Sequence, residues 1–275
     1  MVSCKEYVAI KKEELKEKIK TFERPPKLCV IQVGHNSASD SYIRGKKKDA
    51  EEVGIEFNHI PLPEDIEQGQ LEYQVELQSC LNDGLIVQLP LPKHLDVDRI
   101  TKLIPANKDV DGFKPDSCFK SCTPKGIIDW LKYNNYNFTE KVACVIGRSN
   151  ILGKPLAAML TDLNATVILC HSKTTKRQLD ELISDSDIVF TCIDKIEYFT
   201  SDNFYSYQDI IDVGLGCGKD GKLHGNIEEK SLDKIRELNY GHIIVSGKGN
   251  TGLTTRLALV QNTVAAYELN NGGND

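Results

Sequence analysis

Apolar runs alternate with longer polar segments along the first third of the chain. Three runs have the length of buried strands: residues 28–33, 55–60 and 85–89. The segments between them, at about 39–53 and 68–82, read as helices. This alternation predicts parallel strand pairing with helices on the faces of a sheet. A charged periodic segment at 5–20 predicts an exposed amphipathic helix before the first strand.

The pattern restarts after Thr123, where a helix to about Trp130 is expected. Five further strand candidates follow: the run ending at Ile146 and residues 166–170, 187–193, 209–213 and 242–246. Five strands with interposed helices predict a doubly wound nucleotide-binding domain. The apolar periodic segment 254–269 predicts a final helix that packs back onto the first domain.

The elements together predict an α/β fold of two domains. Residues 1–120 are expected to form an α/β catalytic domain, which the helix 254–269 completes. Residues 121–253 are expected to form a doubly wound, Rossmann-like dinucleotide-binding domain.

Composition narrows the class of protein. The 275 residues are 40% hydrophobic and 27% charged, as in ordinary globular proteins with a substantial core. A net charge of −6 argues against a nucleic-acid partner. No apolar run approaches the roughly 18 residues of a membrane span. The N-terminus lacks the apolar core of a signal peptide, so we expect a cytoplasmic protein.

The nine cysteines are expected to be free thiols. Four lie in apolar, strand-like runs: Cys29, Cys144, Cys170 and Cys192. Such residues act as small hydrophobes in a cytosolic protein. Cys118 and Cys122 form the only close pair, and without a second pair or histidines they make a poor zinc site. We therefore expect no metal.

The stretch from Val33 to Lys46 is the strongest candidate for chemistry. Ser37 and Ser39 are plausible N-caps for the helix that follows the first strand. Tyr42 and Lys46 stand four residues apart and would share one helix face. Ligands bind at the carboxyl ends of strands in open α/β sheets, and this is where the pair would project. By itself, Tyr-x-x-x-Lys also fits an ordinary solvated helix face.

Two further polar residues follow apolar or turn-forming stretches. Gln88 closes the third strand run and either meets solvent or sits beside Lys46 and orients its amine. Asp111 lies in a polar loop, where an aspartate is usually a turn former.

A glycine turn opens the second domain. Gly147-Arg148-Ser149 follows a strand, and Gly153 begins a helix, so backbone N–H groups can approach a phosphate there. NAD-binding domains usually carry an acid after the second strand, whereas this chain has His171-Ser172-Lys173-Thr174. The missing acid and the presence of Arg148 favour a 2′-phosphate, and hence NADP over NAD.

These stretches together resemble the methylenetetrahydrofolate dehydrogenase/cyclohydrolase family. Four motifs match in order: Val33-Gly34 through Ala38-Ser39, Tyr42 and Lys46; Val87-Gln88-Leu89-Pro90-Leu91-Pro92; Lys108-Asp109-Val110-Asp111-Gly112-Phe113; and Gly147-Arg148-Ser149 through Gly153-Lys154-Pro155. Weaker agreement comes from Cys122-Thr123-Pro124, Asp212-Val213-Gly214 and Asn262-Thr263. The resemblance covers about residues 28–267.

The resemblance implies an activity and a set of roles. It implies oxidation of 5,10-methylenetetrahydrofolate by NAD(P)+ to the methenyl form, then hydrolysis to 10-formyltetrahydrofolate, commonly by a homodimer. It implies that Tyr42 stacks on the folate, Lys46 supplies the catalytic amine, Gln88 tunes that amine and Asp111 binds the pterin. The methenyl group is cationic, and like charge and desolvation favour a neutral amine that can activate water.

The sequence departs from the family pattern around the dinucleotide. Residues 248–255 stand where the family has a loop that is roughly Pro-Gly-Gly-Val-Gly-Pro-Met-Thr; Gly252 and Thr255 are retained, whereas the prolines and one glycine are not. Thr191-Cys192-Ile193-Asp194-Lys195 is bulkier and more charged than usual, and Asp194 could repel a phosphate. The alternative hypothesis is therefore a cyclohydrolase with weak or lost dehydrogenase activity.

Two other classes fit less well. Short-chain dehydrogenases also use Tyr-x-x-x-Lys, but there the pair follows the dinucleotide loop, whereas here Tyr42 precedes Gly147. A non-catalytic folate- or nucleotide-binding protein has no need of the Lys46 amine beside a cationic substrate.

Overall fold

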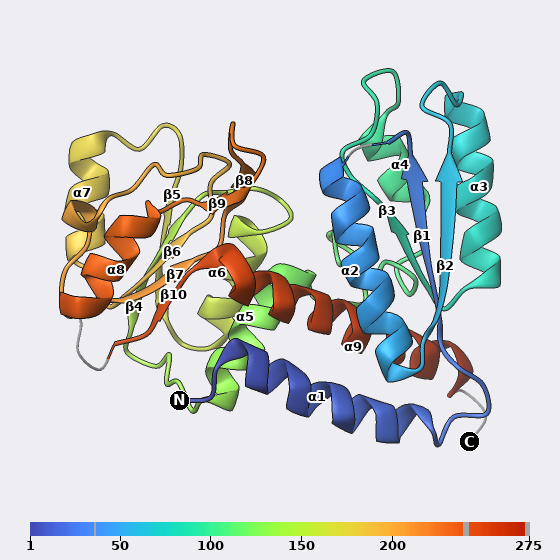
Figure 1. The fold of residues 1–275 in the computed structure, drawn as a ribbon, viewed down its shortest axis with the longest axis horizontal. Helices are drawn as coiled ribbons and strands as arrows, with labels where there is room; N and C mark the ends of the chain where they lie inside the picture. Colours follow the sequence, from blue (N-terminus) through green and yellow to red (C-terminus); the bar gives the residue numbers. More distant parts are fainter. Residues whose placement is uncertain (36, 239–241, 273–275) are drawn as a thin grey trace. The chain divides into compact units, whose positions relative to one another are not determined.

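Strand β1 (Lys27–Val33) is the centre of a three-stranded parallel sheet of order β2-β1-β3. It pairs with β2 (Glu56–Leu62) on one side and with β3 (Gly84–Val87) on the other. The computed structural model describes residues 1–35, 37–238 and 242–272 (Figure 1). The predicted parallel pairing is confirmed.

Alternate residues of β1 serve two different cores. Leu28 and Val30 pack with α2, α9 and β3 residues on one face, whereas Cys29 and Ile31 pack with α3 and α4 on the other. These helices are α2 (Ser37–Val53), α3 (Gln68–Leu81), α4 (Val97–Leu103) and α9 (Gly252–Asn271). Figure 1 shows α2 and α3 on opposite sides of the strands. A strand buried on both faces explains why its sequence is a continuous apolar run.

Two compact units divide the chain. One comprises Met1–Lys5 and Thr123–Thr255, and the other comprises Glu6–Cys122 and Arg256–Asp275. We call the first the central unit, because most of it is the middle of the sequence, and the second the outer unit, because it is formed by the two flanking stretches. Helix α9 carries the chain from the central unit back into the outer one, where its apolar residues join the core of β1. The predicted return of the C-terminal helix is therefore confirmed. Helix α1 (Cys4–Ile19) begins in the central unit and runs into the outer one.

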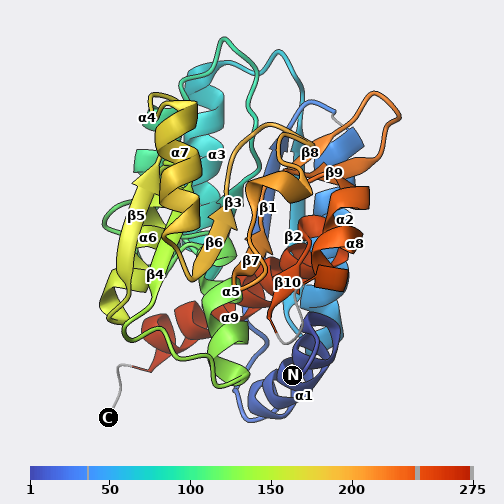
Figure 2. The same ribbon diagram turned by 90° about the vertical axis from the view of Figure 1, so that its left-hand side faces the viewer.

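The central unit contains a five-stranded parallel sheet of order β10-β7-β6-β4-β5, and Figure 2 shows these strands in turn. The strands are β4 (Val142–Ile146), β5 (Thr166–Cys170), β6 (Ile188–Thr191), β7 (Asp209–Asp212) and β10 (Ile244–Val245). All four pairings are parallel. Relative to chain order this is 2-1-3-4-5, the flavodoxin-like form of the doubly wound fold. The predicted fold class is confirmed.

The remaining elements of this unit are helices and one hairpin. They are α5 (Cys122–Tyr133), α6 (Gly153–Asp162), α7 (Lys176–Ser184), η1 (Ser201–Asn203), α8 (Glu229–Leu238), η2 (Gly247–Thr251), β8 (Leu215–Cys217) and β9 (Leu223–Gly225). The antiparallel β8–β9 hairpin was not predicted. None of the helices, over the residues described, is long and apolar enough to cross a membrane.

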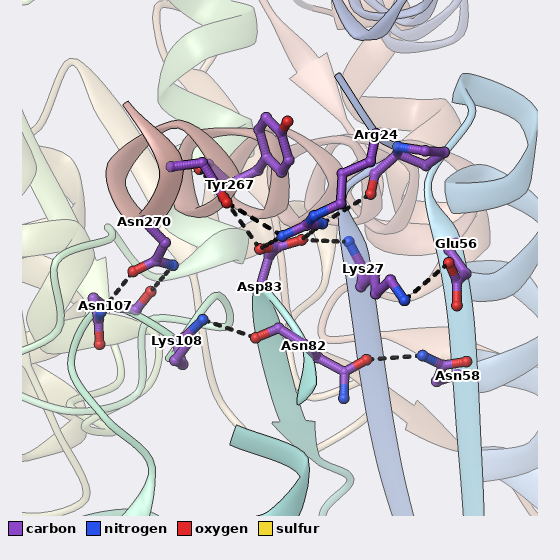
Figure 3. Close-up of polar contacts among 12 residues, drawn as sticks. Arg24, Lys27, Glu56, Asn58, Asn82, Asp83, Asn107, Lys108, Tyr267 and Asn270 are labelled. Carbon is purple, nitrogen blue, oxygen red and sulfur yellow. Dashed lines mark hydrogen bonds and ion pairs between the residues drawn. The ribbon is translucent and has the colours of Figure 1, made fainter. Parts of the chain in front are cut away.

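An ion pair between the exposed Arg24 and the buried Asp83 lies at the amino end of the outer unit's sheet (Figure 3). Arg24 donates to both carboxylate oxygens of Asp83, at 2.7 and 2.9 Å, and the Lys27 N–H donates to the same group at 2.8 Å. Arg24 also lies 4.9 Å from the ring centre of Tyr267 on α9. Burial alone would raise the pKa of Asp83, but the bonds from Arg24 and Lys27 outweigh it and hold the pKa below its ordinary value.

Replacing Asp83 with Asn should destabilise the protein in a pH-dependent way. A carboxylate with a lowered folded-state pKa stabilises the fold above its unfolded pKa of about 4, and this stabilisation is lost as the pH falls through the folded value. We expect D83N to lose about 1.5–3 kcal/mol of unfolding free energy at pH 7, because the buried Asp83 loses its charge-assisted bonds to Arg24 and to the Lys27 N–H. The difference should shrink below about pH 4.

Urea unfolding at pH 7 and at acidic pH measures both effects. The control is E14Q, which breaks the exposed Lys11–Glu14 pair on α1 and should change stability by less than about 0.5 kcal/mol. Equal unfolding free energies for D83N and the wild type at pH 7 would contradict the prediction.

Candidate functional site

Helix α2 places Lys46 at the carboxyl end of the outer unit's sheet. It follows β1 after a short turn, in which Gly34 adopts a φ of +69°. Lys46 is only 8% exposed although lysine is normally a surface residue. Tyr42 lies one turn earlier and is half-buried. Ser39 is buried in the first turn. The side chain of Ser37, the other expected N-cap, is not among those that the structure describes.

Gln88 is brought to Lys46 by the pairing of β3 with β1. Its backbone N–H donates to the Ile31 carbonyl at 2.8 Å, which extends the ladder by one residue. The side-chain Nε2 donates to the Leu89 carbonyl at 2.8 Å, so the amide oxygen faces the amine. Lys46 Nζ donates to that oxygen at 3.2 Å. Of the two alternatives for Gln88, the structure therefore shows the one in which its side chain lies beside Lys46 and bonds the amine.

Asp111 reaches the same amine from a segment that continues the sheet. Asp109 forms an isolated parallel bridge with Leu85 of β3, which places residues 109–111 beside that strand. Lys46 Nζ lies 3.6 Å from Asp111 Oδ2, and the side chains are 10% and 13% exposed. Asp111 is thus an ion-pair partner of Lys46 and not only a turn former.

The Asp111 loop is held rigidly from both sides. Asn262 on α9 donates to the Val110 carbonyl at 2.8 Å and to the Lys120 carbonyl at 3.0 Å. Gly112 has a φ of +69°, and a Cβ there would lie 2.6 Å from the Lys120 backbone. Only glycine fits this conformation and this contact, so the motif's glycine fixes the direction of Asp111.

The arrangement suits proton transfer at one amine. The amide oxygen of Gln88 and the carboxylate of Asp111 both face Lys46. Tyr42 lies one turn earlier on the same face of α2, and its ring can cover a flat ligand. The strand order 2-1-3 puts these groups at the point where the chain direction across the sheet reverses, which is where open α/β sheets bind ligands. Over the residues described, no group of three histidine, cysteine, aspartate or glutamate residues is arranged to hold a metal ion.

The glycine turn of the central unit is closely packed. Gly147 has a φ of +131°, and a Cβ there would collide with the Cys192 carbonyl at the end of β6. A Cβ on Gly153 would in turn collide with the Gly147 carbonyl. Both positions therefore require glycine, and the backbone between them lies close to the start of α6. Leu152 provides no side-chain cap for that helix.

Exposed polar groups surround this turn. Arg148 and Ser149 are exposed, and Ser172 is exposed at the end of the adjacent strand. The strands are joined at this end by the bond from Gly147 N–H to the Cys170 carbonyl, 2.9 Å. A helix N-terminus, an arginine and two hydroxyls fit the phosphates of a dinucleotide.

Comparisons with known proteins agree with both halves of the chain. Residues 2–111 match the family described as tetrahydrofolate dehydrogenase/cyclohydrolase, catalytic domain. Residues 121–271 match the NAD(P)-binding domain of the same family. The chain belongs to the tetrahydrofolate dehydrogenase/cyclohydrolase family.

Relatives in this family match over almost the whole chain. "Bifunctional protein FolD" of Bacillus mycoides is 38% identical over 270 residues, which are 92% of this chain and 91% of the relative. The protein of the same name from Ligilactobacillus salivarius is 37% identical over 257 residues, 88% and 87% of the two chains. The crystal structure of the bifunctional FolD from Campylobacter jejuni is 33% identical, covers 98% of both chains and superposes with a TM-score of 0.89.

The segments that depart from the family pattern have defined structures. Residues 193–195 are held by the buried Asn226, whose Nδ2 donates to the carbonyls of Ile193 (2.9 Å) and Lys195 (2.6 Å), while Asp194 is exposed. Residues 247–251 form a π-helical turn that leads directly into α9. Short π-helical turns often occur at functional sites.

The sequence did not single out two buried carboxylates. Asp212 accepts bonds from Thr191 Oγ1 (2.7 Å) and the Asn226 N–H (3.0 Å), and burial raises its pKa to about 6. Asp49 lies on α2 and binds the side chains of Lys12 and Arg256. Asp212 belonged to a motif of weaker agreement, but nothing in the local sequence distinguishes Asp49 from a surface residue.

Replacing Gly147 with Ala should destabilise the central unit, because the added methyl meets the Cys192 carbonyl and the positive φ is strained. We expect a loss of about 2–3 kcal/mol, the usual size of such strain and overpacking. The control is G69A on α3, where nothing lies within 4 Å of the new methyl. It should stabilise the protein by about 0.4–1 kcal/mol. Chemical unfolding of both variants is the measurement, and a G147A as stable as the wild type would refute the close packing.

Proposed function

We propose that this chain oxidises 5,10-methylenetetrahydrofolate to the methenyl form with NADP+ and hydrolyses the product to 10-formyltetrahydrofolate. Membership of the family supports both activities. The observation that carries the second one is the buried Lys46 amine, 3.2 Å from Gln88 Oε1 and 3.6 Å from Asp111 Oδ2. The proposal includes a cytoplasmic, homodimeric enzyme, as the resemblance implies.

The hydrolysis requires water to be activated beside a cation. The methenyl carbon is electrophilic, so water adds to it once a base removes a proton. The positive substrate favours the neutral form of a neighbouring amine, which can then take that proton. After water has added, the bond between this carbon and N5 breaks; N5 keeps the electron pair and takes up the proton that the hydroxyl group loses, and the resulting formyl group stays on N10. Gln88 holds the amine without adding charge.

Tyr42 and Asp111 are proposed to position the folate. The phenol ring of Tyr42 can stack on the flat pterin, and Asp111 can accept bonds from its amino-pyrimidinone N–H groups. Asp111 also faces Lys46 in the structure, so one carboxylate would contact both the substrate and the amine. Proximity of this kind is a large part of enzymatic rate enhancement.

The oxidation requires a dinucleotide, which accepts a hydride when it is bound. Gly147, Ser149 and Gly153 would hold its phosphates, and Arg148 with Ser172 would bind the 2′-phosphate of NADP. No acid follows β5 to bind a free 2′-hydroxyl, which is why NADP is proposed in preference to NAD. The exposed Asp194 is the feature that favours the alternative, a cyclohydrolase with little dehydrogenase activity.

Replacing Lys46 with Met should abolish hydrolysis. We expect the rate of methenyltetrahydrofolate hydrolysis to fall by about 10²–10⁴-fold, the usual contribution of a general base. The control is K47M on the same helix, whose exposed lysine lies 3.7 Å from Glu51. It should retain the wild-type rate within about twofold, since exposed pairs contribute little.

A spectrophotometric assay decides the outcome. Wild-type protein is given methylenetetrahydrofolate with NADP+ and, separately, with NAD+, and then methenyltetrahydrofolate alone. Nucleotide reduction followed by hydrolysis supports the bifunctional enzyme, whereas hydrolysis without reduction supports the alternative. Undiminished hydrolysis by K46M would remove the amine from the mechanism.

Replacing Arg148 with Ala should weaken NADP+ binding selectively. A lost hydrogen bond to a charged group costs about 1.5–3 kcal/mol, so the Kd for NADP+ should rise about 10-fold or more. The Kd for NAD+, which lacks the 2′-phosphate, should change by less than about twofold. Calorimetry measures both without depending on turnover. R236A, an exposed arginine on α8, is the control, and an equal loss for both nucleotides would contradict the assignment.

A further inference from the structure

We propose that Asp49 and Arg256 are positioning residues for the Lys46 amine. This inference rests on the proposed cyclohydrolase function. Asp49 follows Lys46 by three residues on α2, and Arg256 lies on α9, more than two hundred residues further along the chain. Both belong to the outer unit.

The Asp49 carboxylate joins two cations in a largely buried cluster. Arg256 Nε donates to Asp49 Oδ2, and Lys12 Nζ from α1 donates to Asp49 Oδ1 at 2.6 Å. Lys12 also bonds Glu52 at 2.8 Å, so two cations face two anions. The Asp49 side chain is 6% exposed, and a pair this well buried and bonded is much more constrained than a surface ion pair.

Arg256 also fills the space above Gly45, the residue before Lys46. A Cβ at Gly45 would lie 3.2 Å from Arg256 Cδ and 3.3 Å from its Nε. Glycine inside a helix costs about 1 kcal/mol relative to alanine, so α2 is intrinsically weak where it carries the amine. Arg256 packs against this weak point and bonds one turn further along, at Asp49. Arg256 therefore contacts the helical turn from Gly45 to Asp49 at both ends and restricts its movement.

The consequence for catalysis follows from geometry. Lys46 Nζ must stay within bonding distance of Gln88 Oε1, which is fixed to the sheet by its own backbone bond to Ile31. A shift of the helical turn would carry the amine away from Gln88 and from the attacking water. A displacement of about 1 Å can reduce the rate about 10²-fold without any loss of substrate contacts.

The test compares kcat and KM for methenyltetrahydrofolate hydrolysis in R256M and D49N. We expect kcat to fall about 10-fold or more in each, with KM changed by less than about threefold, because the amine is misplaced while the folate contacts remain. R256K retains a cation that can reach Asp49 and should restore most of the lost kcat. D49N is nearly isosteric, so it provides a folded variant if R256M fails to fold.

The matched control is R24M, which breaks another pair of an arginine with a buried aspartate in the same unit, at the opposite end of the sheet. It should lower the urea midpoint as the other variants do, yet keep kcat within about twofold of the wild type, because its effect is on stability alone. If kcat fell as much in R24M as in R256M, the loss in R256M would be an effect of lower stability, and the inference would be overturned.

The remaining outcomes separate the two proposals. Wild-type kcat in both R256M and D49N would refute the positioning role and leave the proposed function intact. A wild-type protein that fails to hydrolyse methenyltetrahydrofolate would refute the proposed function and this inference with it. A loss of kcat in both R256M and D49N, together with nearly wild-type kcat in R256K, would support both proposals.

Discussion

The parallel register between β1 and β3 is the constraint on which the candidate site of the outer unit depends. It pairs Ile31 with Val87, so that the N–H of the next residue, Gln88, donates to the Ile31 carbonyl. The side-chain amide of Gln88 then lies beside the amine of Lys46, which is on the helix that follows β1. The parallel bridge between Leu85 and Asp109 extends the same register to Asp111. Three polar side chains from distant parts of the sequence thus converge because three neighbouring backbone segments run in one direction.

The two units share the topology that places a candidate site at the carboxyl end of the first strand of each sheet. In each sheet the first strand lies between the second and the third, so the crossovers leave its carboxyl end in opposite directions. In the outer unit this end provides side chains: Lys46, Gln88 and Asp111. In the central unit it provides backbone, because Gly147 and Gly153 allow no side chain between the turn, the Cys192 carbonyl and the start of α6. The first arrangement suits proton transfer, and the second suits a phosphate.

Much of this arrangement could be predicted from the sequence, and the part that could not has a physical reason. The continuous apolar run of β1 and the glycine turn after β4 are local patterns, and local patterns give strands, helices and the order of crossovers. Lys46, Tyr42 and Gln88 were identifiable because strand order alone places them at one end of a sheet. The bond between Asp49 and Arg256 was not, since a pair separated by 207 positions leaves no trace in either local sequence. The β8–β9 hairpin was missed for a related reason: its strands are only three residues each, too short to show a period.

Helix α9 has a consequence for how the protein is made. The face of the outer sheet that carries Leu28 and Val30 is covered in part by Ala258, Val260 and Val264, which the ribosome adds only after the whole central unit. Until then this face of the outer sheet is only partly covered, by α2, although the three strands of the sheet have long been synthesised. The central unit, by contrast, is nearly contiguous in sequence and can fold as it emerges. Completion of the catalytic half therefore coincides with the end of translation, and the nascent outer sheet is the part of this chain most exposed to chaperones and to aggregation.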